Sequence, residues 1–218
     1  GLVPHAGWAY SGATAAVTFS AIAAPAVRTV VVLGAVHRGS VRAPALFGPG
    51  AWATPLGDLA IDDELTRAIS GIEVNPAAHA GEHAIEVQLP FIQVAFPRAR
   101  LVPIAVTPDA RAIDVGENVA NALRGRSDVV VVASSDLTHY GPSYDFAPHG
   151  VGAGAHAWAK RNDAELLDVA ARLGGTEVLR HAAMNQSACG SGALAALVVA
   201  AKRLGAEQGR VLAHTTSF

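Results

Sequence analysis

The chain has 218 residues and a formal net charge of −2, and it is 51% hydrophobic but only 16% charged. This composition excludes a disordered chain, because disorder requires low hydrophobicity together with high net charge. The 16 Lys and Arg residues are scattered along the sequence. Without a basic stripe or a polybasic patch, we expect no nucleic-acid partner and no membrane partner.

The single cysteine, Cys189, has no second cysteine with which to form a disulfide. A chain without disulfides is typical of a reducing compartment, so we expect a cytoplasmic protein. The sequence begins at Gly1 without a basic leader and stops at Phe218, and we expect both ends to be trimmed. No linker interrupts it, which predicts a single domain over residues 1–218.

Short β-branched runs alternate with Ala-rich segments, which is typical of an α/β fold with a mostly parallel sheet flanked by helices. In chain order, the pattern predicts a strand at 1–3, a helix at 11–24, a strand at 28–34, a short hairpin at 44–54, helices at 62–70 and 82–96, a strand at 101–107, a helix at 110–123, a strand at 128–134, helices at 152–173 and 191–204, and a strand at 210–214. Pro90 should kink or break the helix at 82–96. The strands at 28–34 and 128–134 are apolar throughout, which predicts burial on both faces.

Histidines follow three of the predicted strands, close to the point where each strand ends. These are His5, His37 and His139, with Asp136 just before the last of them. Ligands of open parallel sheets bind outside the carboxyl ends of the strands. A single histidine in such a loop often has no role, but three at equivalent positions predict one shared site.

Imidazole is the commonest metal ligand, and two imidazoles with a thiolate or a carboxylate suit iron, copper or zinc. Cys189 directly precedes the helix predicted at 191–204, and a helix N-terminus lowers the pKa of a thiol. Most lone cysteines are buried and structural. Gly190 and Gly192 favour a close backbone approach here, so we interpret Cys189 as functional.

A second metal motif is present, because residues 79–83 match the His-x-x-Glu-His pattern of inverted zinc proteases, with Glu82 as the base. A five-residue match with Gly81 inside the turn is weak. In the competing interpretation, His83 and Glu86 start a helix that lies near the site but outside a zinc triad.

Two serines, Ser134 and Ser135, lie beside Asp136 and His139 and raise the alternative of a serine hydrolase. Such an enzyme needs a base oriented by a third group and an oxyanion hole. The Gly-x-Ser-x-Gly elbow typical of α/β hydrolases does not occur in the sequence, so we favour a polar loop over a hydrolase.

Five blocks of sequence carry a family resemblance. They are VPHAGWAYSG (3–12), GAVHRG (34–39), EHAIEVQLPF (82–91), SSDLTHYG (134–141) and ACG (188–190). In this order they resemble the Memo family, known in prokaryotes as AmmeMemoRadiSam system protein B. The block at 82–91 is the most specific. The resemblance implies a fold like that of the class III extradiol dioxygenases, with a metal cleft in an α/β sheet.

The resemblance also implies a metal site of His5, His37 and Cys189, with Asp136 and His139 beside it. We therefore expect a non-haem iron or copper ion, with zinc as an alternative occupant, in a dioxygenase-like redox enzyme acting on a small organic substrate. His139 would be the general acid or base, and Asp136 would orient a neighbour or add a ligand.

The dioxygenases that it resembles use two histidines and a carboxylate on Fe(II), whereas the third position here is Cys189. A thiolate is softer and can itself be oxidised. The rival hypothesis is a non-catalytic module that binds a short peptide or a partner protein. Trp8, Tyr10 and Tyr140 are expected to line either a substrate slot or a peptide groove, and the sequence does not separate the two. Partner proteins of the AmmeMemoRadiSam system are expected in either case.

Overall fold

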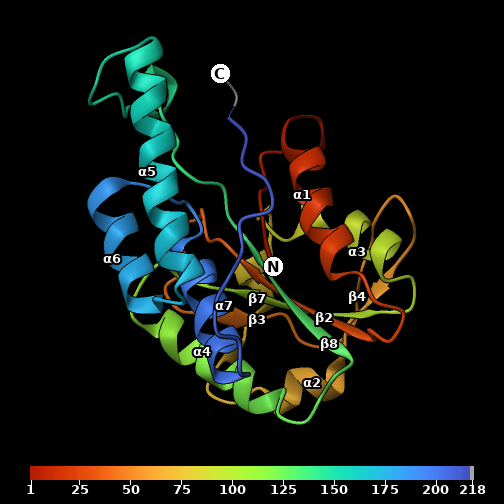
Figure 1. The fold of residues 1–218 in the computed structure, drawn as a ribbon. Coiled ribbons are helices and arrows are strands. Elements are labelled where there is room, and N and C mark those ends of the chain that lie inside the picture. Colours follow the sequence, from red (N-terminus) through yellow and green to blue (C-terminus); the bar gives the residue numbers. More distant parts are fainter. Residues whose placement is uncertain (217–218) are drawn as a thin grey trace.

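The computed structural model describes residues 1–216. Its centre is a six-stranded sheet in the order β1-β8-β2-β7-β3-β6 (Figure 1). Its strands are β1 (Leu2–Val3), β2 (Thr29–Gly34), β3 (Ala45–Leu46), β6 (Glu73–Val74), β7 (Arg100–Ala105) and β8 (Val129–Ser134). The four strands β1, β8, β2 and β7 run parallel, and β3 is antiparallel to β7. The prediction of a mostly parallel α/β sheet is therefore confirmed.

Helices cover both faces of this sheet. They are α1 (Trp8–Ile22), α2 (Asp63–Ala68), α3 (Leu89–Ala95), α4 (Arg111–Ala122), α5 (Ala153–Ala171), α6 (Gly175–Asn185) and α7 (Ser191–Arg203), with short 3-10 turns η1 (Pro76–His79), η2 (Glu86–Gln88) and η3 (Pro142–Tyr144). Figure 1 shows α1 and α3 on one side of the sheet and α4 to α7 on the other. Among the described residues, no helix combines the length and apolarity needed to cross a membrane.

Each face of the sheet has its own apolar core, because successive side chains of a strand point to opposite faces. In β2, Val31 and Leu33 belong to the core that includes α4 and α7, whereas Val30 and Val32 belong to the core that includes α1 and α3. All four side chains are fully buried. Burial on both faces explains why the sequence of this strand is apolar throughout.

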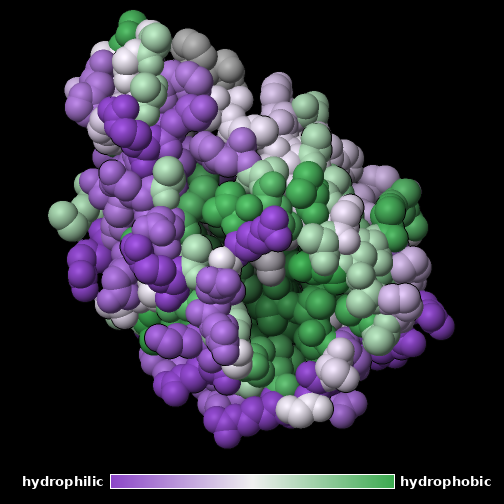
Figure 2. Space-filling view, viewed as in Figure 1, coloured by the Kyte–Doolittle hydropathy of each residue, from purple (hydrophilic) through white to green (hydrophobic). Residues whose placement is uncertain are grey.

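The strand β8 is less covered than its sequence predicts. Val129, Val130 and Val131 are only half-buried, because β1 is short and pairs only with the last two residues of β8. Over the region where Figure 1 draws β8, Figure 2 shows hydrophobic residues gathered in a hollow. The prediction that this strand is buried along its whole length is therefore wrong.

The pairing of the parallel strands aligns the ends that lead into the functional loops. Ser134 at the end of β8 pairs with Val3 of β1 on one side and with Gly34 of β2 on the other. Three chain segments therefore leave the sheet side by side at the same edge, as the sequence predicted.

The strand predicted at 210–214 does not form. This segment carries no regular structure, and its apolar side chains Val211 and Leu212 are 48% and 45% exposed. It is held instead by contacts to α5, where Gly209 donates its N–H to the carbonyl of Ala171 at 2.7 Å. In Figure 1 this stretch runs along the molecule toward the C label, between α5 and α1.

The long helix predicted at 82–96 is also wrong, because α3 begins only at Leu89. Pro90 lies in its first turn, where the missing N–H removes no helical hydrogen bond. The predicted helix is thus broken just before Pro90, as one of the two expected outcomes, and the proline lies in the first turn of α3 instead of at a kink. Similarly, α1 begins at Trp8, three residues before the expected cap at Ser11, whose hydroxyl donates to the carbonyl of Gly7.

Two further differences concern short elements. The hairpin expected at 44–54 is split, because β3 joins the main sheet while β4 (Ala51–Trp52) pairs with β5 (Leu59–Ala60) in a small second sheet. The helix expected at 152–173 ends at Ala171 and is followed by α6, which the sequence analysis did not anticipate.

Candidate metal centre

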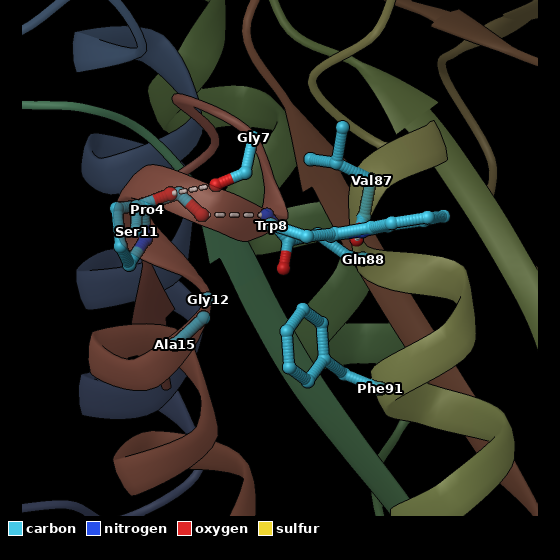
Figure 3. Close-up of a pocket in the computed structure, with 9 residues that line it drawn as sticks. All are labelled: Pro4, Gly7, Trp8, Ser11, Gly12, Ala15, Val87, Gln88 and Phe91. Carbon is cyan, nitrogen blue, oxygen red and sulfur yellow. Dashed lines mark hydrogen bonds between the residues drawn. The ribbon is translucent and has the colours of Figure 1, made fainter.

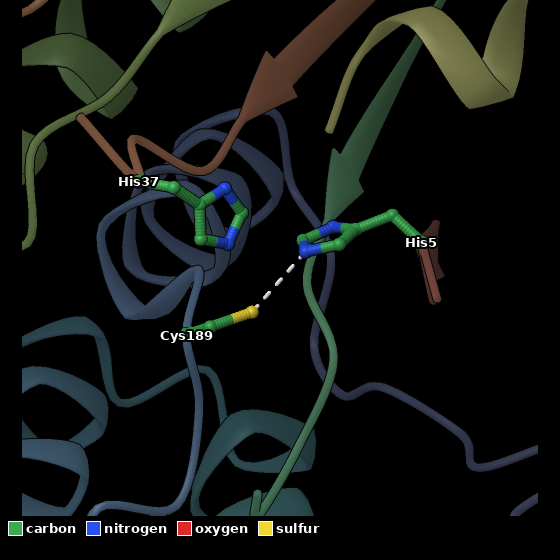
Figure 4. A group of neighbouring side chains, drawn as sticks. All are labelled: His5, His37 and Cys189. Carbon is green, nitrogen blue, oxygen red and sulfur yellow. Dashed lines mark hydrogen bonds between the residues drawn. The ribbon is translucent and has the colours of Figure 1, made fainter. Parts of the chain in front are cut away.

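Two histidines and the cysteine meet where the parallel strands end. His5 follows β1, His37 follows β2, and Cys189 lies just before α7. One ligand atom from each lies within 4.8 Å of the other two, and the Cys189 Sγ is 3.2 Å from the His5 Nε2. Figure 4 shows both rings turned toward the thiol. The structure thus brings together the three residues that the sequence proposed as ligands.

The hydrogen bonds of His5 determine which ring nitrogen carries its proton. His5 is 2% exposed, and its Nδ1 lies 3.0 Å from the Ser134 Oγ. The hydroxyl of Ser134 has one proton, which it donates to the carbonyl of Ala84 at 2.6 Å. It must therefore accept from the His5 Nδ1–H, which leaves the Nε2 lone pair facing Cys189.

His37 is oriented in the same way by Glu82. The carboxylate accepts the His37 backbone N–H at 2.8 Å and lies 2.9 Å from the ring Nδ1. Burial raises the pKa of Glu82, but hydrogen bonds from His37 and from the Ala84 N–H outweigh it and lower the pKa from 4.5 to about 2. A carboxylate this acidic holds the proton on the His37 Nδ1, so the other ring nitrogen is free to bind a cation.

Desolvation keeps the buried His5 and the partly buried Cys189 uncharged in the metal-free protein. It lowers the pKa of His5 from 6.5 to about 4. Burial, reinforced by the nearby Asp136 carboxylate, raises the pKa of Cys189 from 9.0 to about 11. The expectation of a lowered thiol pKa is therefore wrong, because burial and the neighbouring Asp136 carboxylate outweigh the nearby start of α7. A bound cation is what would deprotonate such a thiol.

Asp136 and His139 lie beside this group. The Asp136 Oδ1 accepts the His5 backbone N–H at 2.7 Å, and its Oδ2 is 3.9 Å from the His5 Nε2 and 3.8 Å from the His139 Nε2. Burial raises the pKa of Asp136, but His139 and His5 outweigh it and lower the pKa overall. With Cys189 these two residues form a second set whose ligand atoms lie within 4.8 Å.

The most exposed face of the cluster is formed by histidine side chains. That of His139 is 40% exposed and stacks on Tyr144 with the ring centroids 4.9 Å apart. His83, which is 54% exposed, stacks on His37 at 4.9 Å. A small molecule could therefore approach the buried ligands from this side.

In the structure, His79 and Glu82 have roles other than those that the zinc-protease motif gives them. His79 is buried and bonds the carbonyl of Ala45 at 3.1 Å through its Nε2, and it is in none of the ligand groups found among residues 1–216. Glu82 binds His37. The sequence did not predict that Glu82 and Ser134 orient the two histidines, although both residues lie inside the blocks that resemble Memo proteins.

The glycines around Cys189 allow the close approach that the sequence predicted. A Cβ on Gly190 would lie 2.7 Å from the backbone oxygen of Ser134, and one on Gly192 would lie 2.3 Å from that of Thr107. No side chain fits at these distances, so the expectation is confirmed. The absence of side chains lets the cysteine loop lie directly against the end of β8.

Aromatic residues begin α1 next to the His5 loop. Trp8 is 52% exposed and donates its Nε1–H to the carbonyl of Val87 at 2.8 Å. Figure 3 shows its indole beside Val87 and Gln88, with Phe91 nearby. Tyr10 is 85% exposed. These two rings were predicted to line a substrate slot or a peptide groove.

Fold and site together define an α/β protein with a candidate His₂Cys metal centre at the ends of its parallel strands. The family described as Memo-like protein matches residues 1–218. A MEMO1 family protein of Thermococcus onnurineus is 37% identical over 235 residues, covering 100% of this chain and 80% of its own. Those of Methanopyrus kandleri and Nitrosopumilus maritimus are 36% and 33% identical, covering 99% and 98% of this chain and 75% and 76% of their own. The chain belongs to the Memo family.

Proposed function

We propose that this Memo-family protein binds a non-haem iron or copper ion through His5, His37 and Cys189 and carries out redox chemistry on a small organic substrate. The hydrogen-bond pattern of the two histidines supports this proposal most directly. Ser134 and Glu82 each fix the ring proton on Nδ1. Both imidazoles therefore present an unprotonated Nε2 beside the thiol, which is the form that binds metals.

The donor set fits the proposed metals. Two imidazoles and one thiolate suit copper, iron or zinc better than hard cations such as magnesium, which prefer oxygen ligands. Zinc is the alternative occupant, and the metal content decides among the three. A bound iron or copper ion would supply Lewis-acid and one-electron redox chemistry at this position.

The neighbouring residues would manage protons and the substrate. His139 is partly exposed, and its Nε2 lies 3.8 Å from the Asp136 carboxylate. We assign it as the general acid or base for a substrate that enters from the side of Tyr144, and Asp136 as the group that orients it. We also propose that the protein lies in a reducing cytoplasm, in which Cys189 stays a thiol. Its proposed partners are other proteins of the AmmeMemoRadiSam system.

A second candidate function is supported by the exposed rings of Trp8 and Tyr10. Large exposed aromatic side chains are enriched where proteins bind partners. In this alternative, the metal-site region is a non-catalytic module, and a short peptide lies against the start of α1.

Oxygen uptake by the iron-loaded and copper-loaded protein, with a series of catechols, separates the two functions. We expect uptake by wild type and a fall of roughly 10²–10⁴-fold in His139→Ala, the usual contribution of a general acid or base. His149→Ala, which removes another exposed histidine, is the matched control. Metal binding without uptake by any substrate would favour the binding module.

A further inference from the structure

Two adjacent buried residues of α5 hold the loop that carries His139. Asn162 and Asp163 are 4% and 5% exposed, and both bond Thr138, the residue before His139. The Asp163 Oδ1 accepts the Thr138 backbone N–H at 2.9 Å, and the Asn162 Nδ2 donates to the Thr138 Oγ1 at 2.9 Å. Burying such groups is costly unless their hydrogen bonds are made. Both side chains bond Thr138, and the second carboxylate oxygen of Asp163 lies 2.8 Å from the His214 Nε2.

Asn162 also reaches the loop that carries Cys189. Its Nδ2 donates a second hydrogen bond, at 3.0 Å, to the carbonyl of Asn185, the last residue of α6. A side-chain amide nitrogen has two hydrogens, and these two acceptors use both of them. The carbonyl of Asn185 can only accept, so the amide nitrogen must face it.

The cysteine loop is further anchored just after Asn185. Gln186 adopts a left-handed backbone with a φ of 48°. Ser187 is fully buried, and its hydroxyl lies 2.9 Å from the Nδ1 of His181 in α6. The segment that leads to Cys189 is therefore anchored at the end of α6, and Asn162 connects this anchor to the loop that carries His139.

We propose that Asn162 is a positioning residue that sets the separation between the His139 loop and the Cys189 loop. The two loops also touch directly near the thiol, where the Gly190 N–H donates to the Ser135 Oγ at 2.9 Å and the Cys189 N lies 3.3 Å from the carbonyl of Asp136. Asn162 adds a buried bridge between them and so controls where the thiol lies relative to Asp136 and His139. Its importance for a metal rests on the proposed function.

Four variants test the bridge. Asn162→Asp keeps the shape but removes both donors, and Thr138→Val removes only the hydroxyl acceptor. Thr138→Ser keeps the hydroxyl and should therefore retain the hydrogen bond to Asn162. Thr66→Ala is the control for a lost buried hydrogen bond elsewhere, because Thr66 of α2 is 4% exposed and donates to the carbonyl of Asp62, the residue that caps this helix. Each variant is measured by its unfolding midpoint, by the alkylation rate of Cys189 in metal-free protein at a fixed pH, and by the thiolate-to-cobalt absorption band after Co²⁺ loading.

We expect Thr138→Val to raise the alkylation rate about fivefold, the population change that follows from losing one typical hydrogen bond. Asn162→Asp loses two hydrogen bonds and should raise the rate at least as much, and both variants should shift the cobalt band. Thr138→Ser and Thr66→Ala should match wild type in both readouts, although Thr66→Ala lowers the unfolding midpoint. The proposal is overturned if the two bridge variants lower the midpoint but leave both readouts unchanged, or if Thr66→Ala changes them equally.

If Asn162→Asp fails to fold, the comparison of Thr138→Val with Thr138→Ser is sufficient to decide whether the bridge positions the thiol. If wild type binds no Co²⁺, the proposed metal function fails. The alkylation rates still decide whether Asn162 positions the thiol, because they are measured without metal.

Discussion

The metal-free protein should lose stability as the pH falls from 6.5 toward 4, and His5 should contribute to that loss together with the buried His79, whose pKa is also lowered by burial. His5 is 2% exposed, and burial lowers its pKa from 6.5 to about 4. Between these two values the unfolded chain binds a proton on this imidazole and the folded protein does not. The free energy of unfolding is therefore unaffected by His5 above pH 6.5 and falls with the pH below it.

The magnitude follows from the difference between the two pKa values. Each unit of difference corresponds to about 1.4 kcal/mol, so the full contribution is about 3 kcal/mol. Glu82 acts in a separate window: its pKa is lowered from 4.5 to about 2, so the stability that it contributes is lost only below pH 4.5. Measurements between pH 7.5 and 4.5 thus isolate the imidazole from this carboxylate.

Urea unfolding of wild type and His5→Asn at several pH values across this range makes the comparison. The Asn side chain has an amide N–H that can replace the Nδ1–H donated to Ser134, but it does not titrate. We expect wild type to lose about 2 kcal/mol more than His5→Asn between pH 7.5 and 4.5. His149→Asn, at an exposed histidine, should behave as wild type. Equal pH dependence in wild type and His5→Asn would refute the argument that His5 is buried in its neutral form.

Three further predictions follow from the site. Glu82→Gln should weaken metal binding by about 10–100-fold, as loss of a partner behind a ligating histidine usually does; a chelator competition that gives the wild-type affinity would contradict this. Gly192→Ala should destabilise the protein by about 1–3 kcal/mol, because its Cβ would lie 2.3 Å from the Thr107 oxygen, whereas Gly154→Ala, with open space around the new Cβ, should not lower the melting temperature. Burial and Asp136 raise the pKa of Cys189 to about 11, so alkylation of the metal-free protein should accelerate steadily from pH 8 to 11; a rate that levels off by about pH 10 would show an ordinary thiol.

The elements that were predictable from sequence are those with strong local patterns. The apolar run of β2 indicated a buried central strand, and the histidines after strand ends indicated one shared site. Parallel strands place their carboxyl ends at one edge, so the grouping of His5 and His37 needed no knowledge of the helices. The grouping of Cys189 with these two histidines was inferred from the family resemblance, because the cysteine lies far away in sequence and follows a helix.

The mispredicted elements depend on tertiary contacts that local patterns do not encode. The run at 210–214 has the composition of a strand, but no neighbouring strand pairs with it, and it packs against α5 instead. The pKa of Cys189 was predicted in the wrong direction because the carboxylate that raises it comes from another loop. Glu82 was considered as a catalytic base, since its sequence neighbours are histidines, but its partner His37 lies 45 positions away in sequence.

The central claim is that His5 holds a metal ion while His139 acts beside it. The most direct test is the metal content of wild type, His5→Ala and His139→Ala, each purified in parallel and reconstituted anaerobically with iron or copper. The account predicts a stoichiometric ion in wild type and in His139→Ala, and its loss in His5→Ala, because two remaining ligands cannot hold the ion in a defined geometry. Equal loss in both variants would make His139 a ligand, and equal retention would remove His5 from the site and contradict the assignment.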